Sequence, residues 1–210
     1  AENSGLPSDA SLIDLRFDTG TGDIAYDSSV YGHDADVSPN ETFGPDWTEG
    51  LRGSGMRFDG SDDYVEVPAN SVINDVMDNS TSYSKSIWFK TDSNVDPGRL
   101  IYKRNGLTYN NGKVVATRHD INDNYCDVDS LSVYDDNEWH HAAWTWDSGN
   151  LSLYMDGGYV GSCQTAQPRG DDSGQPVVIG ANSWAKGQNF EGKIDEPRVY
   201  PYTLSADKVR

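Results

Sequence analysis

Near its C-terminus the chain reads Phe190-Glu191-Gly192-Lys193-Ile194-Asp195-Glu196-Pro197-Arg198-Val199-Tyr200, followed by Leu204-Ser205-Ala206-Asp207. Its β-branched and aromatic residues predict a strand over 190–200. Ser205 is a favoured N-cap residue, so a short helix is expected over 205–210. A strand that carries an Asp-Glu pair, then an Arg-Val-Tyr run, then a helix start is an unusual order of signals.

Working outward from this segment, β-branched and aromatic runs bounded by Gly, Asn and Asp predict many more strands. Two hairpin turns are predicted at Asp147-Ser148-Gly149-Asn150 and at Asp156-Gly157-Gly158. Many strands with almost no helix predict an all-β fold of two stacked antiparallel sheets. The expected strands lie near residues 12–18, 55–59, 63–67, 83–91, 113–118, 139–147, 150–155, 159–162, 177–180 and 190–200.

The closing segment resembles the end of the laminin-G-like jelly-roll domains, which belong to the concanavalin A-like lectin/glucanase superfamily. Blocks that resemble the same family follow in the family's order: Leu15–Asp18 with Ala25–Asp34, Met56–Pro68, Ser84–Thr91, Trp139–Trp146 with Leu151–Gly157, and Val178–Gly180. The resemblance covers most of the chain from about residue 11. It implies an antiparallel jelly-roll sandwich whose relatives mostly bind glycans, proteins or calcium and seldom catalyse.

The domain organisation is expected to be simple. Residues 1–10 are polar and are interpreted as a lead-in segment, and residues 11–210 as a single jelly-roll domain. No signal peptide opens the chain, and the family usually continues a little beyond Lys208-Val209-Arg210. We therefore expect this domain to be part of a larger protein.

The composition is strongly acidic: 34 Asp and Glu stand against 16 Lys and Arg, a net charge of −18. Concentrated salt screens the self-repulsion of such a surface, which favours a salt-adapted source such as a haloarchaeon. An acidic, calcium-loaded extracellular domain is the alternative. Nucleic acid is an unfavourable partner for this charge. No apolar run approaches the ~20 residues that span a bilayer, so no membrane insertion is expected.

The chain has two cysteines, Cys126 and Cys163. In the extracellular or cell-surface setting that we expect, they would pair, and the bridge would stabilise the fold by about 4 kcal/mol. Two buried free thiols are the alternative. Three sequons, at Asn40, Asn79 and Asn150, are candidate glycosylation sites.

The family resemblance implies one calcium ion. In the family, an acidic loop and the Asp of the Ile-Asp-Glu strand commonly share it, which assigns side-chain ligands to Asp27 and Asp195. Backbone carbonyls of Tyr31 and His33 would complete the shell of oxygens that Ca²⁺ requires. The loop departs from the family pattern at Val30-Tyr31, where Gly-Asn is usual, and a solvated acidic turn is the alternative.

Glycan binding needs exposed aromatic rings beside amides and carboxylates. Trp184 with Asn182 and Gln188 is the first candidate cluster, and Tyr109, next to Asn110 and Asn111, is another. Packing in the core is the alternative for each ring.

Signals for an enzyme are poor. The Glu-x-Asp-x-x-Glu strand of β-sandwich glucanases, the Gly-x-Ser-x-Gly elbow and the phosphate-binding loop are all missing. The sequence therefore favours a non-catalytic, calcium-stabilised recognition or adhesion module that binds a glycan or a cell-surface protein. The alternatives are a structural domain of a surface layer, appendage or viral spike, and a glycoside-active enzyme or its accessory carbohydrate-binding domain.

Overall fold

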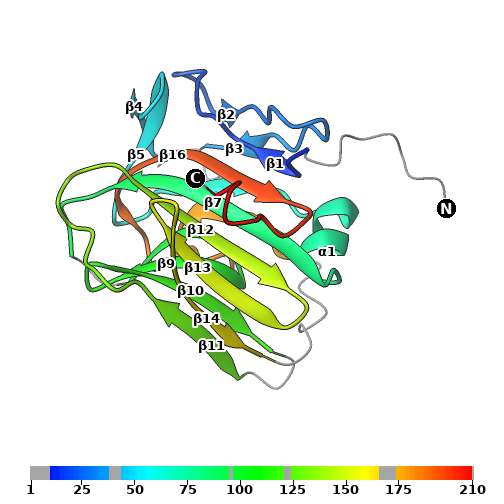
Figure 1. Ribbon diagram of the computed structural model, residues 1–210. Coiled ribbons are helices and arrows are strands. Elements are labelled where there is room, and N and C mark those ends of the chain that lie inside the picture. Colours follow the sequence, from blue (N-terminus) through cyan, green and yellow to red (C-terminus); the bar gives the residue numbers. More distant parts are fainter. Residues whose placement is uncertain (1–9, 38–43, 95–96, 121–123, 166–173, 210) are drawn as a thin grey trace.

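The computed structural model of the chain describes residues 10–37, 44–94, 97–120, 124–165 and 174–209. Its strands form two antiparallel sheets of eight strands each, packed face to face, as predicted (Figure 1). The β12 sheet has the order β14 (Gly158–Gln164), β13 (Asn150–Met155), β12 (His140–Asp147), β7 (Ser82–Lys90), β16 (Glu191–Tyr200), β5 (Ser54–Asp59) and β4 (Asp46–Glu49), with β1 (Ile13–Asp14) also paired to β16.

The β10 sheet forms the second layer. Its order is β11 (Tyr125–Asp129), β10 (Lys113–His119), β9 (Asn105–Asn110), β8 (Gly98–Lys103), β15 (Val177–Gly180), β6 (Val65–Val67), β3 (Ala35–Asp36) and β2 (Ile24–Ala25). Side chains alternate between the two faces of each strand. On β10, Val114 and Ala116 are buried in the core between the sheets, whereas Thr117 and His119 lie on the outer face.

The strands predicted from sequence are present, with β1 much shorter than expected, and the short or polar strands β2, β3, β4, β8, β9 and β11 were not predicted. The prediction of a helix over 205–210 was wrong for the described residues 205–209. Residues 206–208 form a turn in which the backbone N–H groups of Lys208 and Val209 both donate to the carbonyl of Ser205. A helix that was not predicted, α1 (Ser71–Met77), begins after Asn70, whose side chain accepts from the N–H of Ile73 as an N-cap.

The disulfide predicted between Cys126 and Cys163 is present. Cys126 lies on β11 and Cys163 on β14, the strands that end the two sheets on the same side of the sandwich. The bridge therefore joins the two layers where their edge strands would otherwise separate. In the chain-entropy estimate, a closed loop of this length stabilises the native state by about 4 kcal/mol.

Charged side chains are buried inside the sandwich. Lys85 on β7 is 0% exposed, and Arg118 on β10 is 1% exposed. The Arg118 guanidinium lies 3.9 Å from the Trp146 ring centroid and donates to the hydroxyl of Tyr83. Lys103, also buried, contacts both carboxylate oxygens of Asp78 at 2.6 Å. Burial and the neighbouring charges of Arg118 and Lys103 hold the pKa of Lys85 well below its usual value.

Candidate functional site

A cavity of about 500 Å³ lies on the outer face of the β10 sheet. Strands β8 to β11 form its floor, and the loop between β15 and β16 forms one wall. Its volume falls in the range of about 300–1,000 Å³ that is usual for ligand sites. We call it the groove; it is lined by Pro97, Arg99, Tyr102, Arg104, Thr108, Asn110, Val115, Thr117, His119, Tyr125, Asp127, Asn182, Trp184 and Gln188.

Strand register explains why residues far apart in sequence meet in the groove. Thr108 on β9 pairs with Arg99 on β8 and with Val115 on β10. One step along the strands, Thr117 on β10 pairs with Asp127 on β11, and His119 pairs with Tyr125. Because paired residues point to the same face, these residues all project into the groove.

The predicted residues Asn182, Trp184 and Gln188 all line the groove. The Asn182 side chain shapes their loop, because its oxygen accepts from the N–H of Trp184 and its nitrogen donates to Gln188 Oε1. The Trp184 ring is 54% exposed and lies 5.5 Å from the guanidinium of Arg104. An exposed indole beside fixed amides is the arrangement that stacks on a sugar ring while polar groups bond its hydroxyls.

Arg99 is held firmly in this wall. Its Nε and Nη2 donate to Gln188 Oε1 at 3.1 and 2.8 Å, and its Nη1 donates to Thr108 Oγ1. The guanidinium also lies 4.5 Å from the ring centroid of Tyr102. Burial raises the pKa of Tyr102 despite the nearby Arg99 and Arg104, so its phenol stays neutral at physiological pH. The groove therefore presents fixed, charged and neutral hydrogen-bonding groups side by side.

The ring of Tyr109, which was predicted to be exposed to a glycan, is buried. Its ring is 2% exposed and packs in the core against Phe89 and Phe190, and its hydroxyl donates to the carbonyl of Tyr134. Tyr109 directly follows Thr108, which faces the groove. Because side chains alternate between the two faces of β9, Tyr109 points into the core. The exposed aromatic that sequence reasoning missed is Tyr125, which is 67% exposed and packs 4.3 Å from His119 across the strands.

The residues assigned to calcium fall into two separate hydrogen-bonded arrangements. In the loop after β2, the Asp27 carboxylate accepts from Asp14 N, Ser29 N, Ser29 Oγ and His33 N. Tyr31 stacks on His33, with ring centroids 5.7 Å apart, and burial lowers the pKa of His33. Both oxygens of Asp27 thus already accept hydrogen bonds, an arrangement that organises the loop without an ion.

Asp195, on β16, forms the second arrangement. It is 0% exposed; Oδ2 accepts from the N–H groups of Leu51 and Arg52, and Oδ1 accepts from that of Glu196. Within the described residues, no hydrogen bond or ion pair joins Asp195 to Asp27. Backbone N–H groups thus hold both carboxylates in place, and the shared calcium ion stays a prediction from the family resemblance.

We expect Asp195→Ala to lower the free energy of unfolding by roughly 1–3 kcal/mol in calcium and in excess chelator alike, because three backbone N–H groups lose their acceptor. Burial raises the pKa of Asp195 to about 6. An acid whose pKa is raised on folding contributes stability that is lost as pH rises through 6. The substitution should therefore cost more at pH 4 than at pH 8. Urea unfolding in both media checks this, and a loss seen only in calcium would restore the shared ion.

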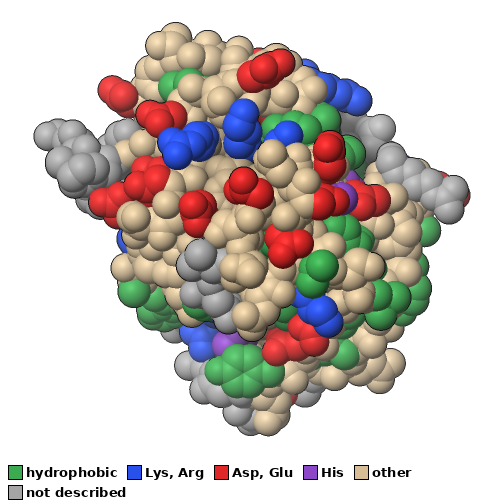
Figure 2. Space-filling model, turned by 90° about the vertical axis from the view of Figure 1, so that its left-hand side faces the viewer, with side chains coloured by type: hydrophobic (Ala, Val, Ile, Leu, Met, Phe, Trp, Pro, Cys, Tyr) green, Lys and Arg blue, Asp and Glu red, His purple; other side chains and the backbone are tan. Residues whose placement is uncertain are grey.

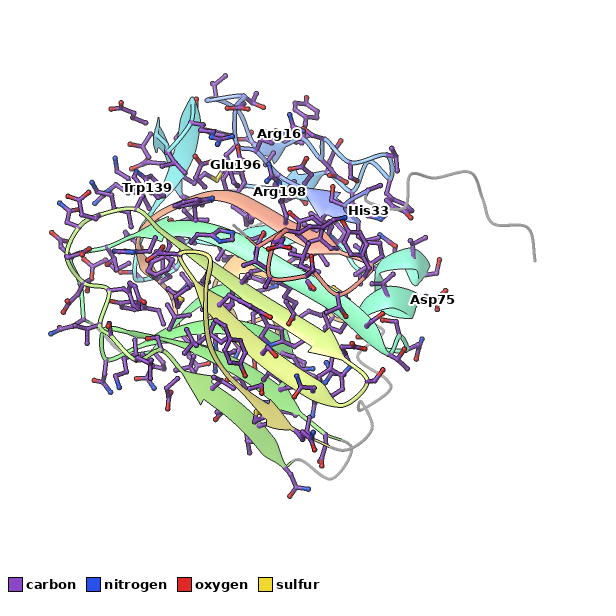
Figure 3. The ribbon with its side chains drawn as sticks, viewed as in Figure 1. Arg16, His33, Asp75, Trp139, Glu196 and Arg198 are labelled. Carbon is purple, nitrogen blue, oxygen red and sulfur yellow. A yellow bond between two sulfur atoms is a disulfide. The ribbon has the colours of Figure 1, made fainter. Side chains whose placement is uncertain are left out.

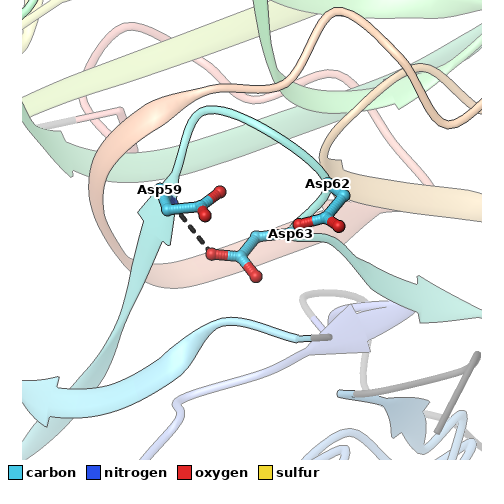
Figure 4. A group of neighbouring side chains, drawn as sticks. All are labelled: Asp59, Asp62 and Asp63. Atoms are coloured by element: carbon cyan, nitrogen blue, oxygen red, sulfur yellow. Dashed lines mark hydrogen bonds between the residues drawn. The ribbon is translucent and has the colours of Figure 1, made fainter. Parts of the chain in front are cut away.

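A different acidic group gathers at the turn between β5 and β6. Ligand oxygens of Asp59, Asp62 and Asp63 lie within 4.8 Å of one another (Figure 4). The Asp63 carboxylate accepts from the backbone N–H of Asp59 at 2.8 Å, and burial raises the pKa of Asp63. The turn and its hydrogen bond thus bring the three acids together. None of the three was predicted from sequence as a metal ligand.

A smaller cavity, of about 230 Å³, lies on the outer face of the β12 sheet beneath the C-terminal segment. Arg198 is central there, donating to Asp14 and to Glu196, while Arg16 approaches the same Asp14 (Figure 3). His141 also lines it, and burial lowers the pKa of His141 to about 4. This network ties β1 to β16 through paired charges, and we assign it a structural role.

The surface carries the acidic charge expected from composition, with Asp and Glu side chains spread over the face in Figure 2. Of the sequons, Asn79 is exposed, and Asn150 is half-buried with its amide donating to Ser152 Oγ. Asn40 lies outside the described residues. The described part of the chain contains no helix that is long and apolar enough to cross a membrane.

Comparison with known proteins points to one family. The family Laminin_G_3, described as the concanavalin A-like lectin/glucanases superfamily, matches residues 59–210. No curated protein sequence matches the chain. Among solved structures, the binding domain of Paraclostridial Mosquitocidal Protein 1 is similar, with a TM-score of 0.74 and 16% identity over 95% of this chain and 51% of that one.

Two more similar structures are complexes with ligands. Domain 4 of AbnA, a GH43 extracellular arabinanase from Geobacillus stearothermophilus in complex with arabinotriose, has a TM-score of 0.69 and 18% identity over 96% of this chain and 97% of that domain. The binding domain of botulinum neurotoxin DC in complex with SialylT has a TM-score of 0.71 and 17% identity over 96% of this chain and 50% of that one. The chain spans about half the length of both toxin binding domains. At these identities the likeness shows the shared fold.

Proposed function

This chain belongs to the concanavalin A-like lectin/glucanases superfamily, and from that premise we propose that it is a non-catalytic module that binds a glycan in the groove. The observation that carries the proposal is the exposed Trp184 ring at the wall of a cavity lined by amides, hydroxyls and guanidinium groups. Sugar recognition in proteins uses this combination of a stacking face and convergent polar groups. The similar domain of an arabinanase in complex with arabinotriose adds support.

The groove is a poor site for glycoside hydrolysis. Hydrolysis of this kind needs two carboxyl groups on opposite sides of the scissile bond. Among the described residues that line the groove, Asp127 is the one carboxylate, and the buried acid Asp120 is not part of that lining. We therefore infer binding, in which the module would hold a glycan for a partner domain or for the surface that carries it.

The extracellular or cell-surface location is part of this proposal. The disulfide between the edge strands supports it, because such bonds persist in oxidising compartments. A salt-adapted source stays a prediction from the acidic composition. A cell-surface protein is the other partner class that the groove could admit, and competition between such a partner and a glycan would reveal it.

Trp184→Ala tests the proposal. We expect it to weaken binding of a glycan found by array screening about tenfold, because loss of an aromatic stacking contact costs about 0.5–1.5 kcal/mol beyond its buried area. Isothermal titration calorimetry measures the change. Tyr159→Ala is the matched control: Tyr159 is 59% exposed, similar to the 54% of Trp184, but lies on β14 outside the groove.

Equal losses in the two variants would place the binding site elsewhere. If the wild-type protein bound no glycan on the array, the structural or assembly role would replace recognition as the leading hypothesis.

A further inference from the structure

We propose that the groove selects glycans that carry an acidic group, a carboxylate or a sulfate, and that Arg99 is the residue that recognises it. This inference rests on the proposed glycan-binding function and names its ligand class. It starts from the geometry of Arg99, whose cationic group is fixed by neutral partners in the wall of the groove.

The first step is the set of partners that hold Arg99. Its three nitrogens donate to Gln188 Oε1 and Thr108 Oγ1, and its plane lies over Tyr102. Within the described part of the chain, none of the ion pairs involves Arg99. A guanidinium has five N–H groups, so these bonds leave two for a ligand. Its charge is therefore positioned without an acidic partner in the described residues, and its two remaining N–H groups can donate to the oxygens of a carboxylate or sulfate.

The second step is the charge of the groove relative to the whole chain. Acidic residues outnumber basic ones by 34 to 16 in the sequence. Among the described residues that line the groove, two are basic, Arg99 and Arg104, and one is acidic, Asp127. A cationic groove in an acidic surface favours an anionic ligand locally, while the surrounding negative charge disfavours non-specific binding of anions elsewhere.

The third step is the link between the cation and the stacking ring. Gln188 Oε1 accepts from Arg99 and also from Asn182, whose own oxygen holds the N–H of Trp184. The backbone N–H of Arg99 donates to the carbonyl of Gln188 as well. Trp184 and Arg99 are thus parts of one hydrogen-bonded unit, which can bind a sugar ring and an acidic substituent together.

The backbone of this loop supports the same conclusion. Lys186 and Gln188 adopt φ values of +52° and +57°, in the left-handed region that non-glycine residues rarely occupy. Such conformations cost free energy and persist where the surrounding structure enforces them, often at ligand sites. Here the strained Gln188 is the residue that clamps Arg99.

The test compares trigalacturonate, neutral galactotriose and a sulfated galactotriose by calorimetry. We expect the wild-type protein to bind at least one acidic trisaccharide ten- to a hundredfold more tightly than galactotriose, because hydrogen bonds to charged groups contribute more than neutral ones. Carboxylate and sulfate sources are distinguished by which acidic probe binds more tightly. The preference should shrink as salt is raised, because screening weakens ion pairing.

Arg99→Gln is expected to remove most of this preference, bringing the affinity for the acidic trisaccharide close to that for galactotriose. Arg99→Lys should restore it in part, since Lys keeps the charge but lacks the planar fork. Arg57→Gln is the matched control, because it removes the same charge from β5 on the other sheet, where Arg57 pairs with Asp46 at 3.5 Å. Thermal unfolding of each variant confirms that the loop and fold remain intact.

Equal binding of the acidic and neutral probes by the wild-type protein would overturn the inference, as would equal effects of Arg99→Gln and Arg57→Gln. The proposed function would survive such a result if a neutral glycan bound in a manner that depends on Trp184. If no glycan of either kind bound, both proposals would fail.

Discussion

Asp78→Ala is expected to lower the free energy of unfolding by about 3–5 kcal/mol, because it removes one member of a buried ion pair. Asp78 caps the end of α1 and contacts Lys103 with both oxygens at 2.6 Å, and the Lys103 side chain is 0% exposed. The same interior also holds the cationic or amine groups of Lys85 and Arg118. Removing the acid therefore leaves an excess of positive charge in a medium of low polarity.

Equilibrium urea unfolding measures this loss. Asp75→Ala is the matched control, because Asp75 lies on the same helix but is exposed (Figure 3), and we expect it to change stability by less than about 0.5 kcal/mol. The double variant Asp78→Ala with Lys103→Met should recover much of the loss, since it removes both charges of the pair. A loss below about 1 kcal/mol for Asp78→Ala would contradict the prediction.

Lys85→Met is expected to have the opposite sign and to stabilise the protein by about 1–4 kcal/mol. Lys85 projects from β7 into the core, opposite Trp144 on β12, and its Nζ lies 5.4 Å from the Trp144 ring centroid. The amine donates to the backbone carbonyl of Asn105. Met preserves the unbranched stem and its packing while removing the group that burial disfavours. Loss of the donor to Asn105 reduces the gain without reversing it.

The pH dependence supplies an independent signature. Since the pKa of Lys85 is lowered on folding, the unfolded chain binds more protons between the two pKa values. Wild-type stability should therefore rise with pH toward the usual lysine value of 10.5, and this part of the rise should be missing in Lys85→Met. Lys90→Met, on the outer face of the same strand, is the control. A variant that is less stable than the wild type at neutral pH would contradict the prediction.

Much of the fold was predictable because its signals are local. The strand over 177–180 and the hairpin formed by β12 and β13 follow from β-branched and aromatic runs and from Gly-containing turns. The strands β8, β9 and β11 escaped prediction because polar residues that line the groove interrupt the apolar pattern of each strand. Helix α1 escaped prediction because seven residues with three β-branched side chains carry little helical signal beyond the Asn70 cap.

The functional site was predictable in part. Asn182, Trp184 and Gln188 lie close together in one stretch of the sequence, so the residue types alone marked this stretch as a candidate site. Arg99 could not be connected with it, because 89 positions separate Arg99 from Gln188. Tyr125 lies in an acidic segment for which no strand was predicted, and the structure places it on edge strand β11.

The sequence by itself determined the two-sheet sandwich, the pairing partners for the disulfide and the acidic charge, since each depends on residue type or on a short-range pattern. The tertiary structure alone decided which aromatic rings are available to a ligand. Trp184 is exposed and Tyr109 is buried, although both stand beside amides in the sequence. Strand register and the stacking of sheets set that difference, because they fix which face of each strand meets the core and which lines the groove.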